Sequence, residues 1–119
     1  MTDNADIHQT ASRQEMTVAR PPIFLPLNKK WYWQFIFGEK SNELRLYGKR
    51  WNEKTCAPGR RVTLSCGYNK QHRRMGTIID FEKRHGSTFS SQDRAAIMEV
   101  YGTLDIWIAC FEISLDPPP

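Results

Sequence analysis

The sequence predicts a small α+β fold, in which a barrel-like sheet of about five to six strands carries two helices. Three observations support this fold class. A chain of 119 residues is long enough for one hydrophobic core. Hydrophobic residues make up 39% of it, and many of them are aromatic, which supplies the apolar surface that a core needs. The strand-like segments outnumber the helix-like ones and do not alternate regularly with them, which disfavours a parallel sheet.

The chain divides into three parts by composition. Residues 1–21 are polar, with scattered apolar side chains and no period, so we expect a flexible N-terminal arm. Residues 22–116 hold the periodic segments and are expected to form a single domain. Residues 117–119 form a short proline tail.

Composition also bears on the cell compartment and on cofactors. No apolar run approaches the roughly 20 residues that a membrane-spanning helix needs, so we expect no membrane association. The three cysteines cannot form a closed disulfide set and none stands in a CxxC pair, which favours reduced thiols in a cytoplasmic protein. The three histidines lack the close pairing with cysteine or aspartate that zinc sites use, and we expect neither a metal ion nor a cofactor.

The first elements are a strand, a helix and a second strand. The apolar run at 23–27 contains a proline, which confines such a strand to a sheet edge or a strand end. Asn28 suits a helix N-cap, and residues 29–37 place aromatic side chains four positions apart, as a short helix would. We expect this helix to stop at Gly38. Residues 42–47 alternate and predict a half-buried strand whose leucines form the apolar face.

The remaining elements are two strands, a helix and a last strand. Residues 61–66 alternate polar and apolar side chains, and residues 74–81 form a further strand-like run. Residues 92–101 show apolar spacings of three and four after a serine and before a glycine, which predicts a capped helix. Residues 105–114 are apolar on both faces, so we expect a central strand there.

Basic residues are concentrated in the middle of the chain. Residues 28–84 hold 14 Lys and Arg against five Asp and Glu, a net charge of +9, whereas residues 1–27 sum to −1 and residues 85–119 to −4. Such a segment favours a polyanionic partner, because phosphates neutralised by Lys and Arg release counterions. A solvated charged face is the alternative that charge alone leaves open.

Two short motifs resemble a known family. Residues 38–45 read Gly-Glu-Lys-Ser-Asn-Glu-Leu-Arg and resemble the GxKxxExR signature of the ASCH domain family. Residues 67–70 read Gly-Tyr-Asn-Lys and resemble the GYxK stretch after the third strand of many short ASCH proteins. The resemblance runs over residues 23–114 and extends to the order of the expected elements.

The resemblance implies a β-barrel similar to the PUA fold, with a charged cleft and a role in binding RNA or another nucleic acid. Some ASCH proteins hydrolyse the acetyl amide of N4-acetylcytidine with a lysine and a threonine nucleophile inside the signature, and other relatives are described as ribonucleases. Lys40 matches the lysine, but Glu43 stands at the threonine position, so the amidohydrolase mechanism lacks its nucleophile here.

Lys40, Glu43 and Arg45 are the candidate residues of the cleft. In a strand, Glu43 and Arg45 project from the same face with Cβ atoms about 7 Å apart, and Lys40 at the preceding turn reaches toward both. A glutamate between two cations suits hydrogen bonds from the amino edge of a base such as cytosine. Arg45 suits a bidentate contact to phosphate or guanine, and Lys40 a point charge for phosphate. An ordinary surface ion pair is the alternative.

A second candidate group follows the third expected strand. Tyr68 stands beside a basic cluster made of Lys70, Arg73 and Arg74. An aromatic ring next to cations is an arrangement that holds single-stranded nucleic acid by base stacking and backbone charge, so we expect these residues at the rim of the cleft. A turn tyrosine packed on its own loop is the alternative.

Three functions follow from these residues. The first is a nucleic-acid-binding domain that engages RNA or single-stranded DNA through the cleft. The second is an enzyme acting on a modified nucleoside or on RNA, with Glu43 as general base and Lys40 as electrostatic stabiliser. The third is a protein-interaction module, in which Trp33 and Phe37, expected to be exposed together on the first helix, form a homodimer or dock on a partner.

Overall fold

The computed structural model describes residues 20–118, so the expected flexible arm at residues 1–21 lies outside the described residues except for its last two positions. The described part contains two α-helices, α2 (Lys29–Ile36) and α3 (Ser91–Tyr101), and a 3-10 turn, η1 (Gly86–Thr88). Its five strands are β1 (Ile23–Leu27), β2 (Asn42–Leu46), β3 (Arg61–Cys66), β4 (Arg73–His85) and β5 (Trp107–Leu115).

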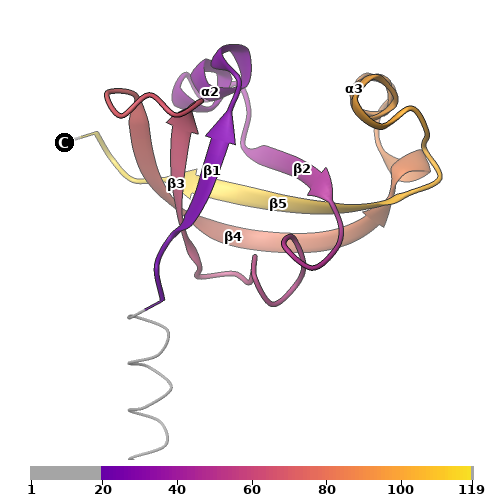
Figure 1. The fold of residues 1–119 in the computed structure, drawn as a ribbon, viewed down its shortest axis with the longest axis horizontal. Helices are drawn as coiled ribbons and strands as arrows, with labels where there is room; N and C mark the ends of the chain where they lie inside the picture. Colours follow the sequence, from indigo (N-terminus) through magenta and orange to yellow (C-terminus); the bar gives the residue numbers. More distant parts are fainter. Residues whose placement is uncertain (1–19, 119) are drawn as a thin grey trace, which may run out of the picture.

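The five strands form one mixed sheet in the order β1-β3-β4-β5-β2. β1 and β3 run parallel, and the other neighbours are antiparallel. The sheet curls into a half-barrel, with the long strands β4 and β5 at its base and the edge strands β1 and β2 on the same side of it (Figure 1). This confirms the expected α+β class with two helices and a curved sheet of about five strands.

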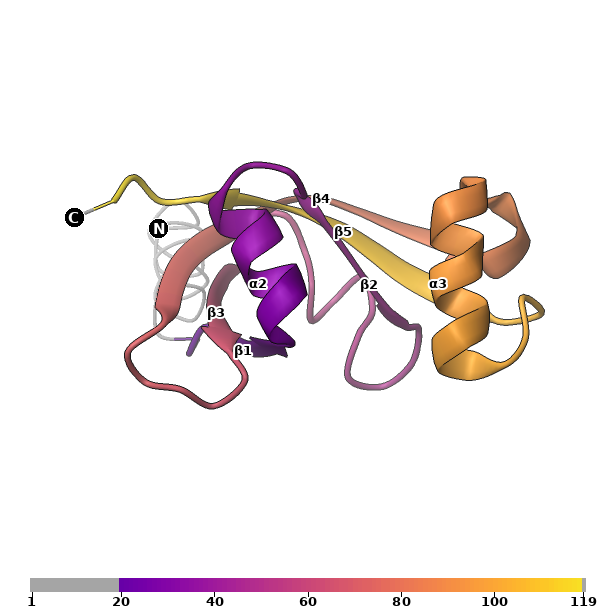
Figure 2. The same cartoon turned by 90° about the horizontal axis from the view of Figure 1, so that it is seen from above.

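The two helices stand apart, with β2 between them (Figures 1 and 2). α2 buries Tyr32 and Phe35 in the main core, together with Phe111 of β5 and residues of β1 and β3. α3 buries Ile97 against Phe89 and Ile108 in a second, smaller core. The helices are therefore anchored on separate hydrophobic clusters. Neither of them is long and apolar enough to cross a membrane.

Local signals for the helix ends are confirmed. The side chain of Asn28 accepts a hydrogen bond from the Trp31 N–H at 2.8 Å, which caps α2. Gly38, just after α2, has a φ of 75°, and Gly102, the C-cap of α3, has a φ of 73°. Both glycines therefore adopt the left-handed conformation that other residues rarely take. The edge position of the proline-containing β1 and the central position of β5 are also as expected.

Two expectations about the strands are wrong. The strand expected at 74–81 continues to His85, because the charged residues at its end pair with the central strand β5. The apolar face expected for 42–47 is buried only in part, since Leu44 packs against the second core but Leu46 is 46% exposed, and the opposite face carries the most buried residue, Glu43, at 7%. β2 is an edge strand that turns its Glu43 face into the half-barrel, which the alternating pattern alone does not show.

An ion pair joins β3 to the end of the chain. The Arg61 guanidinium donates a hydrogen bond of 2.8 Å to one oxygen of Asp116 and contacts the other oxygen as well. These bonds hold the pKa of Asp116 below its ordinary value. A carboxyl whose pKa is lower in the folded state stabilises the fold above its unfolded pKa, near about 3.9, and loses this contribution as the pH falls through the folded pKa.

We therefore expect Asp116→Asn to lower the thermal midpoint at neutral pH and to lose this effect in acid. The measurement is a series of melting curves for both proteins between about pH 7 and about pH 2. The gap between the two midpoints should close below about pH 4. A gap of constant size at all pH values would show that Asp116 contributes through packing rather than through its charge.

Candidate functional site

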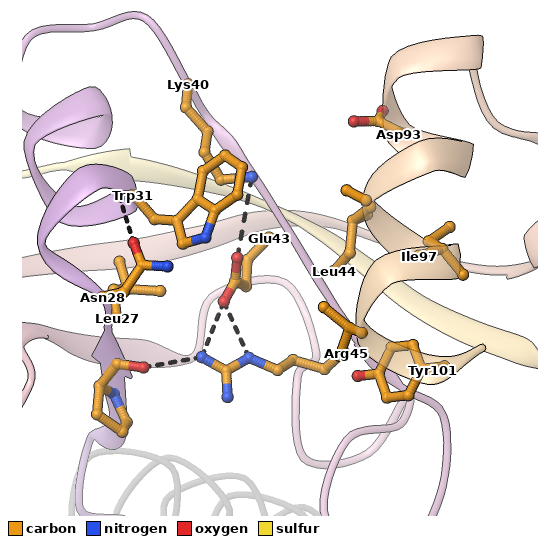
Figure 3. A pocket seen from close by; sticks show the side chains of 13 residues that line it. Leu27, Asn28, Trp31, Lys40, Glu43, Leu44, Arg45, Asp93, Ile97 and Tyr101 are labelled. Atoms are coloured by element: carbon orange, nitrogen blue, oxygen red, sulfur yellow. Dashed lines mark hydrogen bonds and ion pairs between the residues drawn. The ribbon is translucent and has the colours of Figure 1, made fainter.

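A cleft of about 250 Å³ lies between the two helices (Figure 3). Trp31 of α2 and the end of β1 line one side, side chains of α3 line the other, and β2 passes between them. Lys40, Glu43 and Arg45, the three residues that the signature points to, all line this cleft. The structure thus brings together the charged residues that the sequence places within six positions of one another.

Glu43 is the most buried charged residue of the cleft, with 7% of the residue exposed. Its Oε2 oxygen accepts a hydrogen bond of 2.9 Å from Nε of Arg45 and lies 2.9 Å from the Nη2 of the same guanidinium. Its Oε1 oxygen lies 3.9 Å from Nζ of Lys40. The carboxylate therefore stands between two cations, and its burial distinguishes this cluster from an ordinary surface ion pair.

Arg45 connects the two edges of the sheet. Its Nη2 donates a hydrogen bond of 3.0 Å to the carbonyl oxygen of Pro26 on β1, which has no strand on that side. The guanidinium also lies 5.0 Å from the ring of Trp51, which is buried and stacks on Phe111. One side chain thus closes the gap between β1 and β2, where no backbone ladder does, and fixes the position of Glu43.

Two polar groups of this cluster keep hydrogen-bonding capacity toward the cleft. Within the described residues, neither Oε1 of Glu43 nor Nζ of Lys40 takes part in a hydrogen bond, since the 3.9 Å between them exceeds hydrogen-bond distance. Figure 3 shows both atoms in the space between Trp31 and α3. A ligand that offers a donor next to an acceptor would satisfy both groups at once.

An aromatic ring forms one wall of the cleft. The indole of Trp31 lies 5.2 Å from Nζ of Lys40, at a distance typical of a cation–π contact. Tyr101 of α3 lines the opposite side. Sequence reasoning assigned neither residue to the cleft. The signal for Trp31 was present, because it lies on the flank of α2 opposite to Trp33, but only the fold shows which flank faces Lys40.

The residues expected at the rim do not line the cleft. Tyr68 is 79% exposed, and its ring stacks on Phe24 of β1 with centroids 5.8 Å apart. The Arg73 guanidinium lies 5.1 Å from the centre of the Phe24 ring. Lys70 is exposed in the loop between β3 and β4. These three residues form a group of their own around Phe24 and the adjoining loop.

Arg74 is separated from that group. Its guanidinium donates hydrogen bonds of 2.7 and 3.2 Å to the carbonyl oxygen of Asp116. Successive residues of a strand point to opposite faces, so Arg73 and Arg74 diverge although they are adjacent in the sequence. Arg74 binds the backbone that follows β5.

Hydroxyl groups are scarce in the cleft. Among the described residues that line it, Tyr101 carries the only hydroxyl group. Ser41, two positions before Glu43, lines neighbouring hollows instead. Within residues 20–118 no three His, Cys, Asp or Glu side chains come together as a group that could hold a metal ion. The described lining thus offers charged and hydrogen-bonding side chains but no serine or threonine hydroxyl.

Fold and site together define an α+β half-barrel with a charged, aromatic-walled cleft. Comparisons with protein-family models, with curated proteins and with solved structures found no match to the chain.

Proposed function

We propose that this chain is a nucleic-acid-binding domain of the ASCH type, with a PUA-like half-barrel, and that its cleft takes one base of RNA or single-stranded DNA. The observation that carries the proposal is the Glu43 carboxylate, which is 7% exposed and yet leaves Oε1 open to the cleft beside the Lys40 ammonium. Oε1 has no hydrogen-bond donor among the described residues and stays accessible from the cleft, so a ligand donor can bind it without displacing a protein partner.

The geometry favours a base with an amino group next to an acceptor. The amino group would donate to Oε1 of Glu43, and the adjacent ring nitrogen would accept from Nζ of Lys40. Cytosine and adenine carry such an edge, whereas uracil carries a carbonyl where the amino group is needed. The indole of Trp31 offers a stacking surface for the same ring. A volume of about 250 Å³ suits one base rather than a drug-sized ligand.

The charge of the chain supports a polymer rather than a free base. The segment 28–84, which contains Lys40, Glu43 and Arg45, carries a net charge of +9, whereas the α3 wall belongs to the segment 85–119 with its net charge of −4. Lys and Arg side chains around the cleft would neutralise the phosphates on either side of the bound base and release their counterions. Binding should therefore weaken as the salt concentration rises.

We expect the protein to bind single-stranded oligomers of cytidine or adenosine more tightly than oligouridine, and Glu43→Gln to remove most of this preference. The glutamine keeps the shape of the side chain but replaces one acceptor with a donor, which should cost about tenfold in affinity for the amino-bearing bases. Lys40→Gln should weaken the same oligomers, because it replaces the ammonium that donates to the ring nitrogen with a neutral amide on a shorter side chain.

The measurement is a titration of labelled oligomers of about ten nucleotides, at two salt concentrations, with melting curves for each variant. Glu53→Gln is the matched control, because Glu53 accepts a hydrogen bond from Tyr47 away from the cleft. If Glu43→Gln binds each of the three oligomers with the same affinity as the wild type does, the proposal is contradicted.

A hydrolase of the ASCH type is the second candidate, acting on a modified nucleoside or on RNA. The observation in its favour is the same open Oε1, because a carboxylate near an ammonium is placed to take a proton from water in a general-base step. Incubation with N4-acetylcytidine and with RNA, followed by product analysis, addresses it. Turnover that survives Glu43→Gln would exclude Glu43 as the base.

A further inference from the structure

Two aromatic clusters flank the loop between β3 and β4, on the side of α2 that faces away from the cleft. At one end of the loop, Tyr68 stacks on Phe24. At the other end, His72 contacts the ring of Trp33 edge-on, with centroids 5.4 Å apart, and Trp33 stacks on Phe37 at 5.7 Å. We call these five rings and the loop at residues 67–72 the aromatic platform. The two residue groups that the sequence suggested separately are therefore joined by one short loop.

Two rings of the platform are exposed to solvent. Tyr68 is 79% exposed and Phe37 is 69% exposed, more than any other large hydrophobic side chain of the described residues except Val100. Because both rings already stack on a partner ring, they are held in fixed orientations. An exposed ring in a fixed orientation is a ready surface for stacking a further planar group.

The surroundings of the platform are basic. The segments 28–38 and 67–79, which form α2 and the loop with the start of β4, contain no acidic residue. Lys29 lies four positions before Trp33 and thus on the same side of α2 as Trp33 and Phe37. Lys70 stands within the loop, and Arg73 lies 5.1 Å from the Phe24 ring. Stacking surfaces interleaved with cations are complementary to a nucleic-acid strand.

The platform begins beside the cleft. The N–H of Gly67, the first residue of the loop, donates a hydrogen bond of 2.8 Å to the carbonyl oxygen of Leu27. Leu27 itself lines the cleft, and Asn28 after it caps α2. A strand with one base in the cleft would therefore reach the loop by passing the first turn of α2, where Lys29 and Lys30 are exposed.

We propose that the aromatic platform holds the nucleotides that flank the base in the cleft, with their bases stacked on Tyr68 and Phe37 and their phosphates beside Lys29, Lys70 and Arg73. This inference rests on the proposed function and extends the site from one base to a short single strand. Single-stranded nucleic acid is the partner, because the bases of a duplex are already stacked on one another and cannot lie on protein rings.

A second copy of the chain suits the platform less well. In a two-fold dimer the same patch meets itself, so the cations of one platform, Lys70 and Arg73 among them, would face a second platform that carries the same cations. Like charges placed against each other across an interface cost free energy, and no acidic residue of the two segments offsets them. The same cations are favourable against phosphates.

The test compares a ligand that fills only the cleft with one that also reaches the platform. Cytidine monophosphate is the first ligand, and single-stranded oligocytidine of about ten nucleotides is the second. We expect Tyr68→Ala and Phe37→Ala each to weaken oligomer binding at least about fivefold and to leave monophosphate binding unchanged. Ile79→Ala is the matched control, since Ile79 is a 51% exposed apolar residue of β4 outside the platform.

The outcomes separate this inference from the proposed function. In one outcome, Tyr68→Ala and Phe37→Ala leave the affinity for the oligomer unchanged, while Glu43→Gln lowers the affinity for both the oligomer and the monophosphate. This result would overturn the platform and support the cleft. If Tyr68→Ala lowers the affinity for the oligomer and Glu43→Gln does not, the platform is supported and the cleft is overturned. A concentration-dependent dimer that Phe37→Ala dissociates, without any binding of the oligomer, would assign the platform to a second copy and overturn the inference.

Discussion

Arg45→Ala is expected to lower the free energy of unfolding by about 3 kcal/mol. The substitution removes the donors to a carboxylate whose side chain is 9% exposed, so Glu43 would be left buried without its hydrogen-bonded cation. It also frees the Pro26 carbonyl and uncovers the ring of Trp51. Because Arg45 connects the edge strands β1 and β2, its removal should destabilise both edges of the sheet.

Urea denaturation of wild type and variant measures this loss. Arg50→Ala is the matched control, because the Arg50 guanidinium lies 5.2 Å from the same Trp51 ring but takes part in no ion pair of the described residues. We expect the control to cost less than about 1 kcal/mol. Arg45→Lys should fall between the two, since lysine keeps the charge and loses the planar arrangement of donors. Equal effects of Arg45→Ala and Arg50→Ala would mean that the link between the edges contributes nothing to stability.

Arg45 contributes to the fold as well as to the cleft. A variant of Arg45 would weaken binding through the fold even if the guanidinium never touched the ligand. Glu43→Gln and Lys40→Gln are more informative, because the glutamine at 43 still accepts from Arg45 and Lys40 is no part of the link between the strands.

The order and type of the elements follow from local signals in the sequence. The Asn28 cap, the glycines after both helices and the alternation of β3 are properties of a few neighbouring residues. Such signals depend little on the rest of the chain, so they predict the elements to within a few residues. The proline of β1 even indicates an edge strand, since a residue without an N–H cannot complete a ladder on both sides.

The interior of the site depends on contacts between distant residues, which local patterns do not contain. Glu43 is buried because the sheet curls and brings β2 opposite β1, and the alternation of 42–47 fits either face. Trp31 belongs to the cleft because α3, more than sixty positions later, completes the other wall. Strand alternation separates Arg74 from Arg73, but that Arg74 binds the carbonyl of Asp116 depends on the end of β5, some forty positions later. In each case the decisive partner is far away in the sequence.

Trp31→Ala is expected to lower the affinity for single-stranded oligocytidine by about tenfold or more. Stacking of one base on an aromatic side chain contributes about 1–3 kcal/mol, and the indole of Trp31 is the largest planar surface that lines the cleft. The substitution also removes the ring that lies 5.2 Å from Nζ of Lys40, so the ammonium would keep only the Phe35 ring, 5.6 Å away, as a cation–π partner.

Titration of the oligomer and of cytidine monophosphate measures this effect. The affinity for both ligands should fall by a similar factor, because the base that stacks on Trp31 is the one in the cleft. Trp31→Phe should recover part of the affinity, since a smaller ring still stacks. Trp107→Ala is the matched control, because Trp107 is a 51% exposed tryptophan at the start of β5 that does not line the cleft. If both tryptophan variants weaken binding equally, the indole of Trp31 is not a stacking surface, and recognition would then depend on the charged groups of Lys40 and Glu43 alone.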